Sequence, residues 1–109
     1  MRKLAFSLCT AALIVYTGSL SAQDKTGDAA KGKEVFEQCS VCHNADSAEK
    51  KMGPGLKGLF KSAKMVNGKA PTEANVKAKI DEGGNGMPAY KDMLTDEEKT
   101  NLIAYLKTL

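Results

Sequence analysis

The sequence predicts a small all-α domain, about three to four helices wrapped around a centre that side chains alone do not fill. Three segments have a helix-capping residue, at Asp28, Thr72 and Thr95, followed by apolar residues at helical spacing. The connections between them are long, rich in glycine and proline, and contain few apolar residues. A domain of this size has a marginal hydrophobic core and usually needs disulfides, a metal or a cofactor. We therefore expect a disulfide, metal or cofactor to stabilise the centre.

The N-terminal segment is typical of a secretory signal peptide. A basic pair at residues 2–3 precedes an apolar run over residues 4–20, which the small residue Ala22 closes. The alternative is an uncleaved membrane anchor, but the run is at the lower limit for crossing a bilayer and contains polar residues. We expect a signal peptide at residues 1–22 and a mature domain at residues 23–109. The domain would be exported to the periplasm, or tethered to the membrane if the segment is retained.

The first predicted helix runs from Asp28 to Cys39. Asp28 is a good N-cap, and Gly32, Val35, Phe36 and Cys39 lie on one helical face. A glycine inside a helix costs about 1 kcal/mol relative to alanine. Gly32 therefore indicates that another helix approaches closely at this position.

The second and third predicted helices have clear boundaries. Thr72 caps the second helix, and Gly83 and Gly84 end it. Thr95 and Glu98 have the capping-box spacing at the start of the third. The third helix then supplies a broad apolar face for the core, made of Leu102, Ile103, Tyr105, Leu106 and Leu109.

The charge balance argues against nucleic-acid binding. The full chain carries a formal charge of +3, but without the signal peptide 14 basic and 13 acidic residues remain. That balance is not a nucleic-acid footprint. The stretch from Lys50 to Lys69 holds six lysines and no acidic residue. It is either a docking surface for an acidic partner protein, because opposite charges steer encounter, or an ordinary solvated loop, which is the simpler interpretation.

The segment CSVCH, residues 39–43, has the strongest chemical signal. Its two cysteines are Cys39 and Cys42, and His43, the only histidine of the chain, follows at once. Four interpretations compete: buried or disulfide-bonded thiols, a thioredoxin-like redox pair, a zinc site, and covalent haem attachment. The redox pair expects a βαβ pattern that we do not find, and a structural zinc site wants four ligands where this motif offers three.

Covalent haem attachment explains more of the sequence than the other three interpretations. C-x-x-C-H is its signature. Haem also accounts for the export signal and supplies the missing core. We therefore expect one haem c, attached through Cys39 and Cys42, with His43 as a ligand to the iron.

Taken together, this motif and three later segments of the chain resemble the class I c-type cytochromes, of the small monohaem bacterial type. The segments GKEVFEQCSVCH, GPGLKGLF, GMPAY and LIAYL follow in family order over almost all of residues 28–109. The resemblance implies a small helical bundle around one haem c, in which the N- and C-terminal helices cross. Gly32 and Phe36 would lie at that crossing. Their partners in the C-terminal helix would be Leu102 and Tyr105.

The sixth ligand to the iron decides what the haem can do, because a filled position permits electron exchange but not substrate binding. Met87 is the best candidate. It lies among glycines that let the backbone pass close to a flat ring, and Pro88 stiffens the turn. The segment GMPAY also resembles the distal-ligand segment of the family. The other methionines of the mature domain, expected to fill space instead, are Met52, Met65 and Met93.

The resemblance implies two further site residues. The backbone carbonyl of Pro54 would accept a hydrogen bond from His43 and orient its ring. Leu56 would pack on the haem.

Three functions remain open at this point. The first is a soluble periplasmic electron carrier that exchanges electrons with redox partner proteins and has no catalytic residues, hence is not an enzyme. The second is an electron-transfer subunit of a larger exported oxidoreductase. The third is a haem sensor or enzyme with an open iron site, against which Met87 argues.

Overall fold

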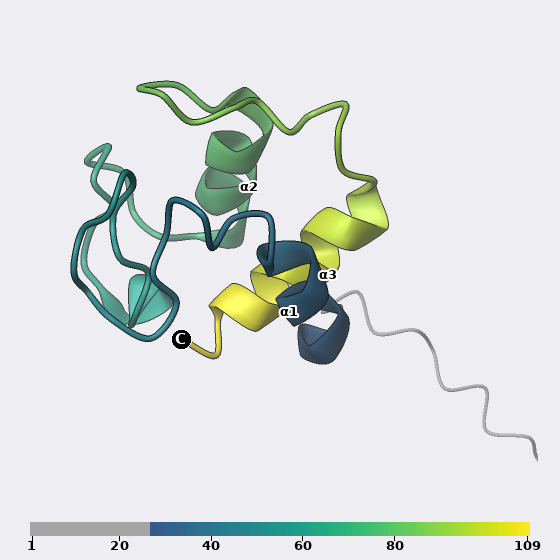
Figure 1. The fold of residues 1–109 in the computed structure, drawn as a ribbon, viewed down its shortest axis with the longest axis horizontal. Helices are drawn as coiled ribbons and strands as arrows, with labels where there is room; N and C mark the ends of the chain where they lie inside the picture. Colours follow the sequence, from purple (N-terminus) through teal and green to yellow (C-terminus); the bar gives the residue numbers. More distant parts are fainter. Residues whose placement is uncertain (1–26) are drawn as a thin grey trace, which may run out of the picture.

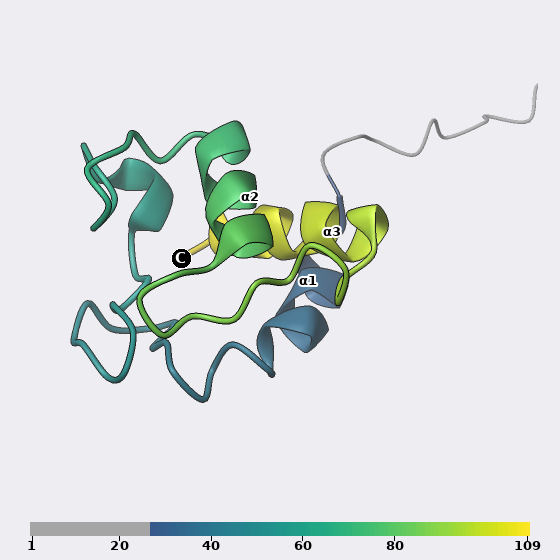
Figure 2. The same cartoon turned by 90° about the horizontal axis from the view of Figure 1, so that it is seen from above.

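The fold consists of three α-helices and a short 3-10 helix, shown in Figure 1. The computed structural model of the chain describes residues 27–109, so the predicted signal peptide lies outside the described residues. The elements are α1 (Ala29–Phe36), η1 (Leu59–Lys61), α2 (Glu73–Glu82) and α3 (Asp96–Leu106). Helix α1 packs mainly on α3, and the long segment between α1 and α2 forms one side of the molecule (Figures 1 and 2). The described part of the chain contains no named β-strand, and the predicted all-α class is confirmed.

The predicted caps begin all three α-helices. The Asp28 carboxylate accepts hydrogen bonds from two N–H groups in the first turn of α1, and the Thr72 hydroxyl accepts one in α2. In α3 the Thr95 hydroxyl and the Glu98 side chain bond reciprocally and form the expected capping box. The starts of α2 and α3 are therefore set by capping residues that can be recognised in the sequence.

The first helix is shorter than predicted, since α1 ends at Phe36 and not at Cys39. Beyond it the chain continues in tight turns: the Cys39 N–H lies 2.7 Å from the Phe36 carbonyl, and the Cys42 N–H lies 3.1 Å from the Cys39 carbonyl. These i to i+3 bonds occur beside i to i+4 bonds from the N–H groups of Ser40 and His43, so the segment forms turns and no regular α-helix. The haem-motif residues consequently lie in a turn after the helix.

The crossing of α1 and α3 depends on Gly32. A Cβ atom at this position would collide with the backbone carbonyl of Asn101 and would lie 2.8 Å from Cβ of Tyr105. Asn101 is thus the main neighbour of Gly32, where the sequence had suggested Leu102. The predicted partner Tyr105 is present, and its ring packs against Phe36 with centroids 5.4 Å apart at an angle of 55°.

A polar contact closes the same crossing. The Asn101 side chain is buried, and its Oδ1 accepts a hydrogen bond of 2.8 Å from the backbone N–H of Asp28. This bond ties the start of α1 to the middle of α3 and gives the buried amide oxygen its partner.

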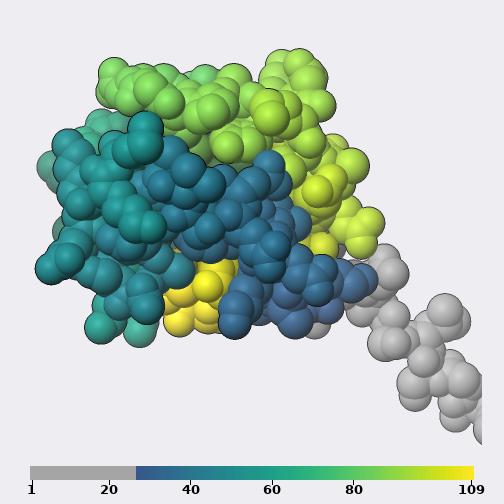
Figure 3. All heavy atoms as spheres, in the orientation of Figure 1, coloured from purple at the N-terminus to yellow at the C-terminus, as the bar shows by residue number. Residues whose placement is uncertain are grey.

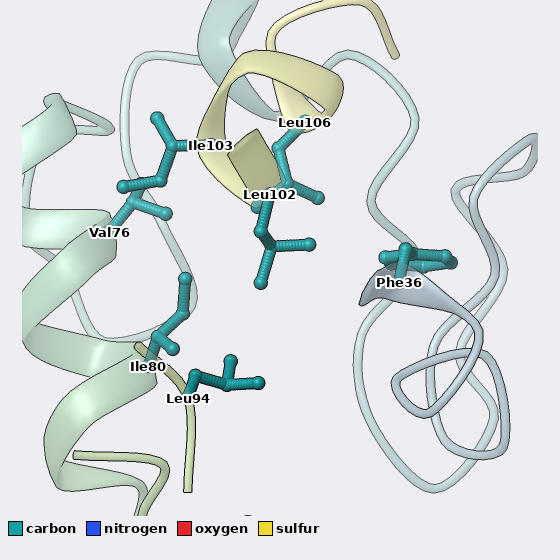
Figure 4. Packing of buried hydrophobic residues seen from close by; sticks show 7 residues of the cluster. All are labelled: Phe36, Val76, Ile80, Leu94, Leu102, Ile103 and Leu106. Carbon is teal, nitrogen blue, oxygen red and sulfur yellow. The ribbon is translucent and has the colours of Figure 1, made fainter. Parts of the chain in front are cut away.

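The hydrophobic core is small and is centred on α3. Leu102 is its most buried side chain, with 2% exposure, and Figure 4 shows it pointing into the cluster. The buried members are Phe36, Val76, Ile80, Leu94, Leu102, Ile103 and Leu106. Among residues 27–109, no helix is long and apolar enough to cross a membrane.

Candidate haem site

The motif CSVCH forms one compact turn directly after α1. The carbonyl of Cys39 accepts hydrogen bonds from the N–H groups of both Cys42 (3.1 Å) and His43 (3.0 Å). Both cysteines are half-buried free thiols. One turn therefore carries both thiols and the imidazole at fixed spacing, next to the end of a packed helix.

A hydrogen bond to Pro54, the contact that the family resemblance implied, sets the orientation of His43. The His43 Nδ1 atom lies 2.8 Å from the Pro54 carbonyl oxygen. A carbonyl oxygen only accepts hydrogen bonds, so Nδ1 is the protonated nitrogen and Nε2 keeps its lone pair for a metal. This is the usual arrangement of a metal-binding histidine, in which the hydrogen bond fixes the tautomer and ring orientation.

Gly53 gives the imidazole its space. A Cβ atom there would lie 2.5 Å from Cε1 and 2.9 Å from Nδ1 of His43. The Gly53 N–H also donates to the Cys42 carbonyl at 2.8 Å. The glycine lets the segment that carries Pro54 run directly along the histidine ring.

Leu56 lies next along the same segment. Its backbone N–H donates to the Asn44 carbonyl at 2.8 Å, and its half-buried side chain packs against the core. This hydrogen bond and the two involving Gly53 and Pro54 hold residues 53–56 against the CSVCH turn.

Met87 lies at the end of a tight two-residue turn. The N–H and carbonyl groups of Gly84 and Met87 exchange hydrogen bonds of 2.9 and 3.1 Å. The two residues between them have positive φ angles, 52° at Asn85 and 89° at Gly86. Positive φ at both central positions defines a type I′ turn, for which Asn-Gly is the preferred pair. This turn makes the backbone at Met87 well defined.

Gly83 sets the approach of this turn to the end of α2. Its φ is 63°, and a Cβ atom there would collide with the Met87 carbonyl and lie 2.6 Å from the Pro88 carbonyl oxygen. Further on, the N–H of Tyr90 donates to the Ile80 carbonyl at 3.0 Å. The Met87 segment is thus held against α2 on both sides of the methionine.

The Met87 segment and the cysteine motif border a common region. Burial raises the pKa of the Tyr90 phenol, and the nearby thiolate charges of Cys39 and Cys42 raise it further. Burial, and then the charge of Cys42, raise the pKa of the Cys39 thiol. In the space-filling view, the segment after α2 borders the segment that follows α1 (Figure 3).

The four methionines of the described chain differ in burial. Met52 and Met93 are 80% and 62% exposed, although the Met52 sulfur lies 4.0 Å from the Cys42 sulfur. Met65 and Met87 are half-buried and pack against the core. Met87 lies in the segment held against α2, whereas Met65 belongs to a separate loop near Lys69.

The residues present fit a covalently bound haem. Two free thiols would suit covalent attachment, and an imidazole with a free Nε2 and a thioether would suit binding of the iron. Partly buried apolar side chains pack beside the core; they include Leu56, Leu59, Phe60, Met65, Met87 and Tyr90. Fold and donor set together define a small all-α protein that carries one haem through C-x-x-C-H.

Comparison with known proteins agrees with this description. The family model described as Cytochrome c matches residues 29–109. Cytochrome c2 of Blastochloris viridis is 40% identical over 77 residues, covering 69% of this chain but only 56% of that protein. Cytochrome c2 of Rhodospirillum rubrum is 33% identical over 110 residues, covering 76% of this chain and 82% of the relative. Cytochrome c6 of Leptolyngbya boryana is 36% identical over 80 residues, covering 72% and 89%.

A solved structure gives the same result. Cytochrome c6 from the diatom Phaeodactylum tricornutum superimposes with a TM-score of 0.57 at 29% identity, covering 75% of this chain and 93% of that one. The chain therefore belongs to the cytochrome c family and is a class I c-type cytochrome. It carries one covalently attached haem c and is an electron carrier.

Sequence reasoning missed two features of the site. Gly53 was not singled out, although a glycine beside Pro54 is a signal of close backbone approach. The Asn85-Gly86 turn was missed as well, although Asn-Gly is the strongest two-residue turn signal.

Proposed function

We propose that this chain is an exported periplasmic electron carrier whose haem iron is bound by His43 and Met87. Cys39 and Cys42 would form the two thioether bonds to the haem. The observation that carries the proposal is the hydrogen bond from His43 Nδ1 to the Pro54 carbonyl, which leaves Nε2 free to bind a metal. When bound, the haem supplies an iron that cycles between the ferric and ferrous states.

His43 acts as a fixed and basic ligand. Its Nδ1–H donates to Pro54, which increases the electron density on the ring and prevents rotation about the side chain. Gly53 lies directly against one edge of the ring, so the ring has no room to move in that direction. The ligand geometry is therefore set before electron transfer and need not reorganise during it.

Met87 would be the second protein ligand to the iron. A thioether favours ferrous iron and raises the reduction potential relative to a second histidine. The type I′ turn and Gly83 hold its backbone in place. A filled sixth position excludes substrate, which supports a carrier without catalytic chemistry of its own.

The experiment compares three single variants of the haem-loaded protein. Met87→Ala should bind carbon monoxide in the ferrous state, lose the methionine-to-iron charge-transfer band in the ferric state, and fall in reduction potential. Met52→Ala and Met93→Ala are matched controls, because both side chains are mainly exposed, and they should behave as the wild type. Loss of the band in Met52→Ala but not in Met87→Ala would contradict the assignment.

The Lys50 to Lys69 stretch is the proposed docking surface for redox partners. All six of its lysines are exposed. Reversing the charge of Lys57, Lys61 and Lys64 should slow electron transfer to an acidic partner and flatten its dependence on ionic strength. A salt dependence equal to that of the wild type would show that this stretch is an ordinary solvated loop.

A further inference from the structure

One charged side chain of α3 is buried beneath the Met87 segment. Lys99 is only 3% exposed, and it is one of two buried polar or charged residues in the described chain. A buried ammonium group is costly unless it is paired and hydrogen-bonded. Its partners therefore indicate what the residue does.

Lys99 bridges two other parts of the molecule. Its Nζ atom lies 2.7 Å from Asp81 Oδ1 in α2 and donates a hydrogen bond of 2.9 Å to the backbone carbonyl of Lys91. The second Asp81 oxygen pairs with Lys77 at 2.9 Å, one turn earlier in α2. The Lys77 ammonium is largely solvated, whereas that of Lys99 is enclosed.

The peptide of Lys91 is held from both sides. Its N–H donates to the Asp81 carbonyl at 3.3 Å, and its carbonyl accepts from Lys99. The preceding N–H, that of Tyr90, donates to the Ile80 carbonyl at 3.0 Å. The Lys91 peptide lies four residues after Met87, and the type I′ turn ends at Met87.

We propose that Lys99 is a positioning residue for the sixth ligand: its ammonium locks the segment after Met87 onto α2 and α3, and so keeps the methionine on the iron. The inference rests on the proposed ligation by Met87. The turn at Asn85-Gly86 fixes the backbone on the N-terminal side of Met87, and Lys99 fixes it on the C-terminal side. The turn bonds the Met87 backbone, whereas the hydrogen bond of Lys99 goes to the carbonyl of Lys91, four residues further on.

Replacing Lys99 by methionine separates positioning from general stability. Removing one member of a buried ion pair lowers global stability, although Asp81 keeps its contact with Lys77, and the Lys91 carbonyl loses its donor. An external ligand binds the iron only in the fraction of molecules whose methionine has left, so its apparent affinity reports that fraction. A role confined to stability would change the urea midpoint and leave this affinity alone.

The test measures imidazole binding to the ferric, haem-loaded protein together with urea unfolding. We expect Lys99→Met to bind imidazole about ten- to hundredfold more tightly than the wild type, the range expected for a lost hydrogen bond to a charged donor. Lys77→Met is the matched control, because it removes the other partner of Asp81 without touching Lys91, and it should stay within about twofold. Equal affinity in Lys99→Met and the wild type, or an equal rise in Lys77→Met, would overturn the proposal.

Lys99→Gln gives a second test that does not depend on the methionine variant being produced. Its amide keeps a donor for the Lys91 carbonyl but loses the charge, so we expect an intermediate, few-fold rise in imidazole affinity. No rise would count against the proposal. If the wild type binds imidazole as tightly as Met87→Ala does, ligation by Met87 itself is contradicted. If the wild type binds imidazole weakly and Lys99→Met has the same affinity, only the role of Lys99 is contradicted.

Discussion

The crossing of α1 and α3 and the segment around the haem motif are built on different principles. At the crossing, the two helices pack directly on each other: Gly32 fits against the Asn101 backbone, and the Phe36 ring packs on Tyr105. Around the motif, backbone hydrogen bonds hold loops in place, and the apolar side chains stay half-buried. The first region is complete as protein, whereas the second is arranged to contact a cofactor.

The stability of the protein therefore depends both on its own core and on the bound haem. The helices supply caps and a small buried cluster, which alone would be marginal for a domain of this size. The loops supply a set of ligands and a partly apolar surface. We therefore expect variants of the crossing to change mainly the urea midpoint, and variants of the loops to change mainly haem attachment and ligation.

The largest effect is expected from the double variant Cys39→Ala with Cys42→Ala. It removes the covalent attachment, and we expect loss of bound haem and a largely unfolded chain, because folding is coupled to the bound group as in other small domains. Far-ultraviolet circular dichroism measures the helical content. A near-native spectrum without haem would show that the helical crossing suffices on its own.

The helical crossing is tested by Gly32→Ala. The new Cβ would push the α3 backbone away, and overpacking of this kind costs about 1–3 kcal/mol of unfolding free energy, partly offset by about 1 kcal/mol of helix propensity. The haem spectrum should stay unchanged while the urea midpoint falls. The control is Gly58→Ala, where φ is 71° but no atom lies within 4 Å of the new Cβ, so only the backbone strain acts. Equal losses in both variants would contradict a steric role for Gly32.

The cofactor side is tested by Gly83→Ala. A Cβ there would collide with the backbone of Met87 and Pro88, and should displace the methionine with less effect on global unfolding than Gly32→Ala. We expect increased carbon monoxide binding by the ferrous protein. Gly86→Ala is the control, because its φ is also positive, at 89°, but its surroundings are open. A greater response in Gly86→Ala would mean that turn strain, and not the contact with α2, governs the methionine.

The smallest effect concerns acid. The hydrogen bond from Lys77, and then the Lys99 ammonium 2.7 Å from the other carboxylate oxygen, hold the pKa of Asp81 below its usual value of about 3.9. Since the folded-state pKa is lowered, the stabilisation is fully present above about pH 4 and is lost as the pH falls through the folded pKa. Urea midpoints of the wild type should fall more steeply in this acid range than those of Asp81→Asn. Parallel curves for the two proteins would exclude Asp81 as a contributor.

Much of this fold follows from the sequence, because its signals are local. The residues Asp28, Thr72 and Thr95 cap helices through their own neighbours, and all three caps are present. The need for a close neighbour at Gly32 was also predictable from the cost of a helical glycine. The extent of α1 was not, since turn and helix compete at its end and both satisfy the backbone near Cys39.

The contacts that depend on distant parts of the chain were harder to predict. Burial of Lys99 depends on Asp81 and Lys91 meeting it in space, and a lysine on a helix is normally expected at the surface. Asn101 likewise serves α1 from 73 residues away. The contact between His43 and Pro54 was expected only from a family resemblance, because spacing alone does not place a loop carbonyl against a ring.

The most direct test of His43 and Met87 ligation is the visible spectrum of the reduced, haem-loaded wild type with and without carbon monoxide. We expect a low-spin c-type spectrum that carbon monoxide leaves unchanged, because His43 and Met87 would both bind the iron. A spectral shift on adding carbon monoxide would show that the sixth position opens, and would contradict Met87 as a lasting ligand.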